Sequence, residues 1–213
     1  MRTSLEGQRH YEITGEKLPS VTTILSATQS DDKKESIARW TARVGKEQAT
    51  RVKDQAASRG TNMHLHHERY IEGKGHLDLT DEGQVAGDMA QTIIDKGLCD
   101  MSEIWGSEVA LYVPNLYAGT TDLVGQYKGN ACIMDFKQTN KPKKLEWVQD
   151  YFLQLTAYAI AHNEIYDTNI NEGHIFMCSR AGEYQQFDLW PHEFKEWEQE
   201  WWNRVYAYYE KHG

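Results

Sequence analysis

Apolar residues recur at the three-to-four-residue spacing of helices through the first half of the chain. Four helices are predicted there, over about residues 19–25, 33–58, 61–73 and 82–96. Ser20 and Thr61 are expected to begin the first and third of them, because a hydroxyl can accept a hydrogen bond from the free N–H groups of a first turn. Gly45 should break the second helix, and Gly60 should separate it from the third.

The second half of the chain changes to the two-residue alternation of strands. Strands are predicted over residues 104–113, 117–127, 131–137, 173–179 and 183–190, and helices over about 145–163 and 191–211. Tight turns should join two pairs of strands, at Lys128-Gly129-Asn130 and at Arg180-Ala181-Gly182. This order of elements predicts an α/β fold with a mixed central sheet flanked by helices.

The composition indicates one folded domain over residues 1–213, because 39% of the side chains are apolar and no repeat or Pro/Gly/Ser-rich linker interrupts them. A helical N-terminal part at about 19–97 should precede a sheet with its helices at about 101–211. The net charge of −9 argues against a protein that coats nucleic acid through many Lys and Arg contacts. Local binding along one basic groove is compatible with it.

The cysteines and the N-terminus bear on the compartment. Cys99, Cys132 and Cys178 are widely spaced and form no CxxC pair, so reduced thiols are expected in place of disulfides or a zinc site. No signal peptide and no run of about 18 apolar residues is visible. We therefore expect a cytoplasmic protein, in the host cytoplasm if phage-encoded, with no membrane partner.

Two aspartates and a lysine in the first predicted hairpin carry the chemistry. In a two-residue turn at 128–129, Asp122 lies opposite Asp135, and in a turn at 129–130 it lies opposite Lys137. Either register places the three side chains on one face. Opposed carboxylates repel unless a cation lies between them, and Mg²⁺ prefers such oxygen ligands and keeps bound water. The alternative is a solvent-facing pair with an ordinary surface ion pair at Lys137.

The neighbouring residues favour the metal site over that alternative. Cys132, Met134 and Phe136 make one face of the second strand apolar, and Ile133 shares the face of the aspartates. A charge in a strand that is covered on both faces needs a partner. Lys137 could place or activate a water molecule, or stabilise the charge that develops on a phosphate.

Several motifs in order make the chain resemble a nuclease family. They are Pro19-Ser20-Val21-Thr22, Arg59-Gly60-Thr61 with His64, Glu108 at a strand opening, Gly119-Thr120-Thr121-Asp122, Asp135-Phe136-Lys137 and Gln154-Leu155-Thr156-Ala157-Tyr158. Over about residues 19–163, the chain is similar to PD-(D/E)XK nucleases of the RecB-like exonuclease branch, especially the mitochondrial genome maintenance and related phage exonucleases. Thr121 and Gln138 depart from the family pattern.

The resemblance implies a PD-(D/E)XK, restriction-endonuclease-like core and gives the matching residues roles. Asp122 and Asp135 would hold Mg²⁺ or Mn²⁺ together with the backbone carbonyl of Phe136, and Lys137 would be catalytic. The resemblance also places His64 beside the metal as a further ligand. His64 and Glu68 share a helix face, so an exposed His–Glu pair is the alternative.

Other residues are expected around this centre. Glu108 could join the metal site or orient a water molecule, or it could face solvent at a strand end. The resemblance places Gln154, as a catalytic residue, and Tyr158 near the scissile phosphate, and it places Ser20 and Arg59 against DNA phosphates. Further candidates for phosphate contacts follow the catalytic strand directly: Lys141, Lys143 and Lys144. An aromatic stripe near the C-terminus could stack bases or dock on the sheet: Phe194, Trp197, Trp201, Val205 and Tyr208.

We therefore expect a metal-dependent exonuclease that hydrolyses phosphodiester bonds from DNA ends in phage or cellular DNA processing. Single strands are the expected substrate, because the resemblance is to an exonuclease with that preference. One alternative is a structure-specific or restriction-type endonuclease with the same catalytic residues. The other is a noncatalytic DNA-end-binding module of the same fold.

Overall fold

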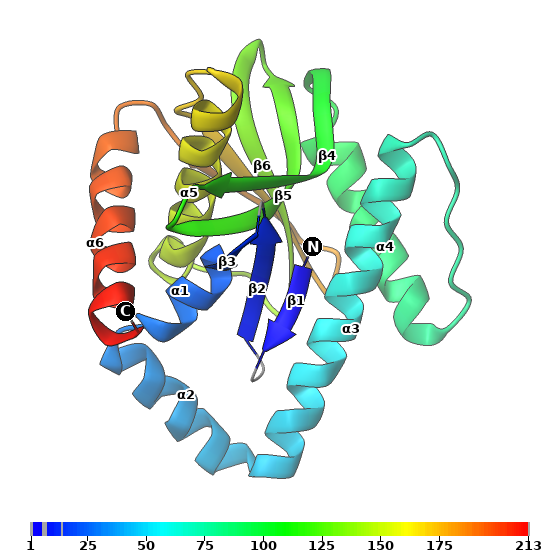
Figure 1. The fold of residues 1–213 in the computed structure, drawn as a ribbon. Coiled ribbons are helices and arrows are strands. Elements are labelled where there is room, and N and C mark those ends of the chain that lie inside the picture. The colour runs from blue at the N-terminus through cyan, green and yellow to red at the C-terminus, as the bar shows by residue number, and fades with distance from the viewer. Residues whose placement is uncertain (1, 6–7, 14, 213) are drawn as a thin grey trace.

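A five-stranded sheet forms the centre of the protein (Figure 1), in a computed structural model that describes residues 2–5, 8–13 and 15–212. In sheet order, the strands are β4 (Met101–Val113), β5 (Tyr117–Tyr127), β6 (Asn130–Thr139), β7 (Gly173–Ser179) and β8 (Tyr184–Leu189). β6 and β7 pair in parallel, and the other neighbours are antiparallel. The predicted α/β fold with a mixed central sheet is confirmed.

Helices lie on both faces of this sheet. Those of the described residues are α1 (Val21–Ala27), α2 (Asp31–Val44), α3 (Lys46–Ile71), α4 (Asp81–Gly97), the 3₁₀ helix η1 (Leu145–Trp147), α5 (Gln149–Tyr166) and α6 (Phe194–His212). One hydrophobic core joins α1, α5 and α6 to the sheet, and a second joins α3 and α4 to it. The C-terminal aromatic stripe belongs to the first core, where the Trp201 ring lies 4.9 Å from that of Tyr117 in β5. Docking is therefore the correct interpretation of the stripe.

The β5–β6 hairpin adopts the first of the two predicted registers. Its turn consists of residues 128 and 129, whose φ values of 51° and 85° are those of a type I′ turn. Pairing extends to Leu123 opposite Met134. The next residues along the two strands, Asp122 and Asp135, therefore face each other.

The beginnings of the first helices follow from local signals. The Ser20 Oγ accepts a hydrogen bond of 2.9 Å from the N–H of Thr23, so Ser20 is the predicted N-cap of α1. Gly45 separates α2 from α3 as predicted, with a φ of 87°. Positive φ is a conformation that glycine adopts at little cost.

Gly60 does not separate two helices, contrary to the prediction, because α3 continues through it. The hydroxyl of Thr61 donates to the carbonyl oxygen of Ala57 one turn earlier (3.1 Å), so it does not cap a first turn. A glycine inside a helix costs about 1 kcal/mol relative to alanine. Burial of other α3 residues, such as Met63, outweighs this local cost.

The last two long helices begin later than predicted. The helix expected from Leu145 opens with the separate turn η1, and α5 follows from Gln149. Pro191 lies in a turn before α6, in which the N–H of Glu193 bonds to the carbonyl oxygen of Trp190 (3.0 Å). This turn delays the start of α6 to Phe194.

A three-stranded antiparallel sheet precedes α1 and is absent from the prediction. Its strands are β1 (Arg2–Leu5), β2 (Gln8–Ile13) and β3 (Glu16–Pro19). Tyr11 and Leu18 are buried in a small cluster with Ala118 of β5. So few apolar positions in a polar segment give no clear periodicity in the sequence.

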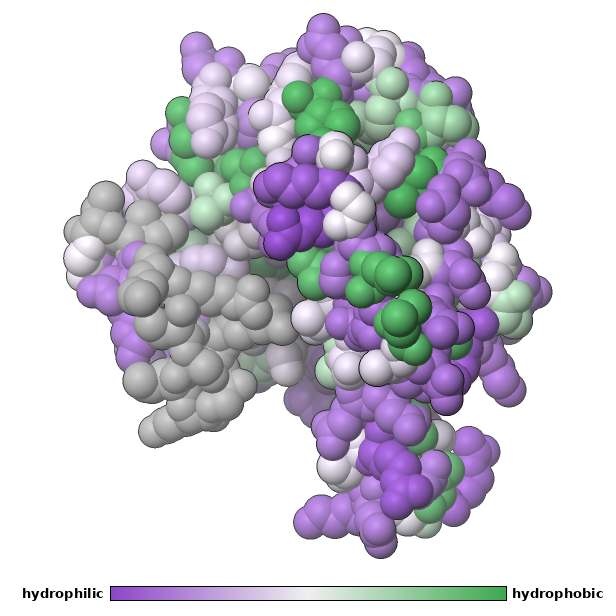
Figure 2. Space-filling model, turned by 90° about the vertical axis from the view of Figure 1, so that its right-hand side faces the viewer, coloured by the Kyte–Doolittle hydropathy of each residue, from purple (hydrophilic) through white to green (hydrophobic). Residues whose placement is uncertain are grey.

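The joint between α2 and α3 projects away from the sheet (Figure 1), and mainly hydrophilic residues cover the projection (Figure 2). None of the residues of α2 is buried. No helix in the described ranges has the length and apolar character that a membrane span requires. The two hydrophobic cores beside the five-stranded sheet do not include α2, which stays exposed.

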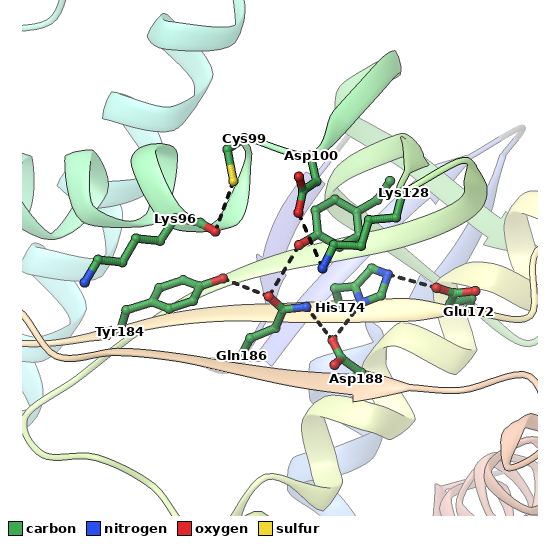
Figure 3. A network of polar contacts seen from close by, with 10 residues as sticks. Lys96, Cys99, Asp100, Lys128, Glu172, His174, Tyr184, Gln186 and Asp188 are labelled. Atoms are coloured by element: carbon green, nitrogen blue, oxygen red, sulfur yellow. Dashed lines mark hydrogen bonds and ion pairs between the residues drawn. The ribbon is translucent and has the colours of Figure 1, made fainter.

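A buried histidine organises a polar network on β7 and β8 (Figure 3). His174 Nδ1 lies 2.8 Å from Asp188 Oδ1, and His174 Nε2 lies 3.3 Å from Glu172 Oε1. Gln186 donates to Asp188 (2.7 Å) and accepts from Tyr184 (3.1 Å). Burial, which would raise the pKa of Asp188, is outweighed by the hydrogen bonds from His174 and Gln186, so that pKa is lowered.

Replacing His174 with alanine should destabilise the protein. The substitution leaves Asp188 and Glu172 without their shared partner, and breaking a buried charged contact costs about 2–4 kcal/mol. Urea unfolding of His174→Ala, followed by circular dichroism, measures the loss. His192→Ala is the matched control, because His192 is exposed, and equal stability of the two variants would contradict the role given to His174.

Candidate functional site

A cavity of about 530 Å³ opens between α3, the start of α1 and the ends of β5 and β6. The residues predicted for the site that line it are Ser20, His64, Glu108, Asp122, Asp135, Lys137, Gln154 and Tyr158. They come from five separate elements and the N-cap of α1. The fold therefore gathers in one cavity residues that span much of the sequence.

Asp122 is held by groups on two other elements. Its Oδ2 accepts a hydrogen bond of 2.8 Å from the N–H of Phe136, and its Oδ1 lies 3.3 Å from His64 Nδ1. Burial would raise the pKa of Asp122, but His64, Lys137 and the Phe136 N–H outweigh it, so that pKa is lowered. Burial likewise opposes protonation of His64, but the Asp122 carboxylate outweighs it and raises the pKa of His64.

Asp135 is paired with Lys137 of the same strand. The Asp135 side chain is 2% exposed, and its Oδ2 lies 2.5 Å from Lys137 Nζ. Burial and the nearby Asp122 outweigh the lysine and raise the pKa of Asp135 to about 6. Burial would lower the pKa of Lys137, but Asp135 and Asp122 raise it. The cavity thus holds two carboxylates in a place where additional positive charge would stabilise them.

The backbone of Phe136 faces Asp122. In an extended strand, the N–H and C=O of one residue point toward the same neighbouring strand. Because the Phe136 N–H donates to Asp122, its carbonyl oxygen also leaves β6 on the β5 side. The side chain of Phe136 packs on α3, where the centre of its ring lies 4.1 Å from the centre of the buried His67 ring.

Glu108 faces Asp122 across β4 and β5. It lies between two paired positions, Ser107 opposite Leu123 and Val109 opposite Thr121, and has a φ of 52°. Such a backbone costs a non-glycine residue about 1–3 kcal/mol, a cost that is common at functional sites. Glu108 lines the cavity and is also exposed, so its role at the metal site stays a prediction.

His64, Glu108 and Asp122 form a group that could hold a metal ion. Each offers one nitrogen or oxygen atom, and these atoms lie within 4.8 Å of one another; in the described part of the chain no other group of three does so. Asp135, which was also predicted as a metal ligand, is not one of these three residues. The carboxylate of Asp135 is paired with Lys137 instead.

Gln154 and Tyr158 form the α5 wall of the cavity. Gln154 Nε2 donates to Tyr158 Oη (3.1 Å), and burial raises the pKa of Tyr158 well above its usual value. Gly119 of β5 makes room for this ring, because a Cβ there would lie 2.5 Å from Tyr158 Cε1. Tyr11 closes the cavity from the unpredicted N-terminal sheet, where its hydroxyl bonds to Thr120 Oγ1 (3.0 Å).

Arg59 has a structural position, which corrects its prediction as a phosphate contact. Its side chain is 1% exposed and does not line the cavity. It donates to Gln138 Oε1 (3.0 Å) and Asn140, and it pairs with Glu82 (3.3 Å). Gln138, which departs from the family pattern, also donates to the Ala56 carbonyl oxygen (3.0 Å) and so fastens α3 to β6.

The three lysines predicted to contact phosphates lie outside the cavity: Lys141, Lys143 and Lys144. Lys141 and Lys144 are exposed, and Lys143 is half-buried. Gln185 of β8 holds the backbone of Lys143 through two hydrogen bonds of 2.7 and 2.8 Å. Their side chains therefore belong to a neighbouring surface.

No protein-family profile matches the chain. Comparison with individual proteins gives three relatives that share one name. Mitochondrial genome maintenance exonuclease 1 of Xenopus tropicalis is 26% identical in an alignment that covers 92% of this chain. The chain is similar to this exonuclease. The proteins of the same name from Mus musculus and Homo sapiens are 27% and 26% identical, over 78% of this chain. The resemblance to mitochondrial genome maintenance exonucleases that was found in the sequence is therefore confirmed.

The chain spans 50–59% of the length of these relatives. Among solved structures, a candidate exonuclease from Eubacterium rectale has a TM-score of 0.49 and 12% identity, and the match covers 69% of this chain and 63% of that one.

Two glycines of the cavity wall should respond oppositely to alanine. Gly60→Ala should stabilise the protein by about 0.5–1 kcal/mol, because alanine favours a helix interior; its Cβ would make an ordinary contact of 3.7 Å with Gln138. Gly119→Ala should destabilise it by about 1–3 kcal/mol through overpacking against Tyr158. Urea unfolding of both variants measures these changes, and a destabilised Gly60→Ala would contradict the continuity of α3.

Proposed function

We propose that the chain is a single-domain, divalent-metal-dependent DNA nuclease that acts as an exonuclease on single-stranded ends. The observation that carries the proposal is the convergence of Asp122, Asp135 and Lys137 with His64 and Glu108 in one cavity. The relatives support it, because all three are named as exonucleases. Their name also favours exonuclease over endonuclease action.

The donor set suits Mg²⁺ or Mn²⁺. Asp122 and Glu108 offer hard oxygen ligands, which Mg²⁺ prefers, and an imidazole such as that of His64 is compatible with Mn²⁺. Asp135 and the carbonyl of Phe136 face the same region from β6 and would complete the ligand set. When bound, the ion would lower the pKa of a bound water molecule and offset negative charge on the phosphate.

The side chains of this protein have their own parts in such a reaction. Lys137 keeps its proton in the cavity, as its raised pKa indicates, and can donate a hydrogen bond to a phosphate oxygen. Asp135 holds the lysine in position through the 2.5 Å contact. Tyr158 stays protonated because its pKa is raised, so its hydroxyl is a donor that Gln154 can orient toward the phosphate.

Substitution at the centre should abolish cleavage. Lys137→Ala and Asp122→Asn should each lower the rate at least about 100-fold, the loss typical of a removed catalytic donor, and EDTA should stop the wild type. A gel assay on fluorescent single- and double-stranded DNA in Mg²⁺ or Mn²⁺ measures these rates. Lys96→Ala, exposed at the end of α4, is the control; undiminished cleavage by Lys137→Ala would refute the mechanism.

The mode of cleavage follows from substrates with different ends. An exonuclease should shorten linear strands labelled at one end and leave a covalently closed circle intact. Time courses with labels at either end also give the direction of digestion. Cutting of the closed circle would favour an endonuclease, and binding to linear and circular DNA without cleavage in either metal would favour a noncatalytic module.

A further inference from the structure

A second groove, of about 770 Å³, lies beside the cavity between α2, the beginning of α5 and α6. The two share a wall at α5, because Leu153 lines the groove and its neighbour Gln154 lines the cavity. The contact of Lys137 Nζ with the Tyr151 ring, 5.1 Å from its centre, joins the cavity to the same helix end. A strand that leaves the cavity past this helix end would enter the groove.

The segment between β6 and α5 forms one side of this groove. Residues 140–148 contain three lysines and one glutamate, in a protein whose net charge is −9. The same segment exposes two large apolar side chains, Leu145 at 63% and Trp147 at 56%. Lys144 Nζ lies 5.4 Å above the Trp147 ring. Exposed aromatic rings beside cations are the means by which proteins bind single-stranded nucleic acid.

The charges of the groove are distributed unequally over its walls. Asp32 lies on α2 and Glu200 on α6, whereas the segment after β6 contributes Lys143 and also Glu146, which lies 3.8 Å from Lys144 Nζ. Asp150 at the groove floor is neutralised by Lys33 and by Arg204, whose Nη2 lies 2.8 Å from it. Phosphates would therefore be favoured along the lysine side, next to Trp147.

We propose that Trp147 is a base-stacking platform for a single DNA strand that leaves the cavity, with Lys141, Lys143 and Lys144 along its phosphates. The inference rests on the proposed function, and it gives the three lysines a binding role although they lie outside the cavity. It places the contact several nucleotides from the scissile bond. Strands too short to reach the groove should therefore not depend on Trp147.

Binding of fluorescent single strands of graded length, measured by anisotropy in EDTA so that cleavage is stopped, tests the proposal. Trp147→Ala should weaken binding of long strands about 5- to 100-fold, the range expected for one base–aromatic stack. Trp147→Phe should retain most of the affinity. Trp105→Ala is the matched control, because Trp105 is also exposed, at 42%, but lies on β4 away from the groove.

The lysines can be tested separately through the salt dependence of binding. Each phosphate contact of a single strand contributes about 0.7 to the slope of the logarithm of affinity against the logarithm of salt concentration. Lys143→Ala and Lys144→Ala should each reduce that slope by about this amount. Lys96→Ala should leave it unchanged.

The outcomes separate this inference from the proposed function. If the wild type cleaves DNA but Trp147→Ala binds long strands as tightly as wild type, the groove is not a strand-binding site and the nuclease proposal stands. An equal loss for short and long strands would also overturn the inference, because it would indicate damage to the cavity. If the wild type neither binds nor cleaves DNA, the proposed function itself fails.

Discussion

Two carboxylates that face each other across a hairpin, the half-buried Asp122 and the buried Asp135, set the main constraint on this structure. Their repulsion in a cavity with little solvent has to be offset by positive charge and hydrogen bonds. Lys137 supplies the charge for one, and His64 and the N–H of Phe136 support the other. Since His64 belongs to α3, this balance requires α3 to dock beside the edge of the hairpin.

The docking of α3 explains several features that have no direct part in chemistry. Arg59 and Gln138 form a buried polar link between the helix and β6, and His67 packs on the ring of Phe136. Gly60 lies opposite Gln138, where an added Cβ would make an ordinary contact of 3.7 Å. These contacts fix the helix that carries His64, so they help to position the site.

Backbone conformation and a neighbouring groove also shape the surroundings of the cavity. Glu108, whose φ is positive, has a ligand atom within 4.8 Å of Asp122, and Gly119 leaves space for Tyr158 to line the cavity. Beyond the cavity, Lys143 and the exposed Trp147 border a separate groove. The chemistry of the centre and the binding of a strand are thus assigned to adjacent surfaces that share α5.

Local rules determined much of this protein from sequence alone: the alternation of β5 and β6, a tight turn within residues 128–130 that places Asp122, Asp135 and Lys137 on one face, and the Ser20 cap. Each depends on residues a few positions apart, where backbone preferences dominate. Only the tertiary structure decided that Arg59 is buried, that Glu108 joins His64 and Asp122, and that Tyr11 closes the cavity. These outcomes depend on contacts between residues far apart in the chain, whose burial and charge outweigh local propensity.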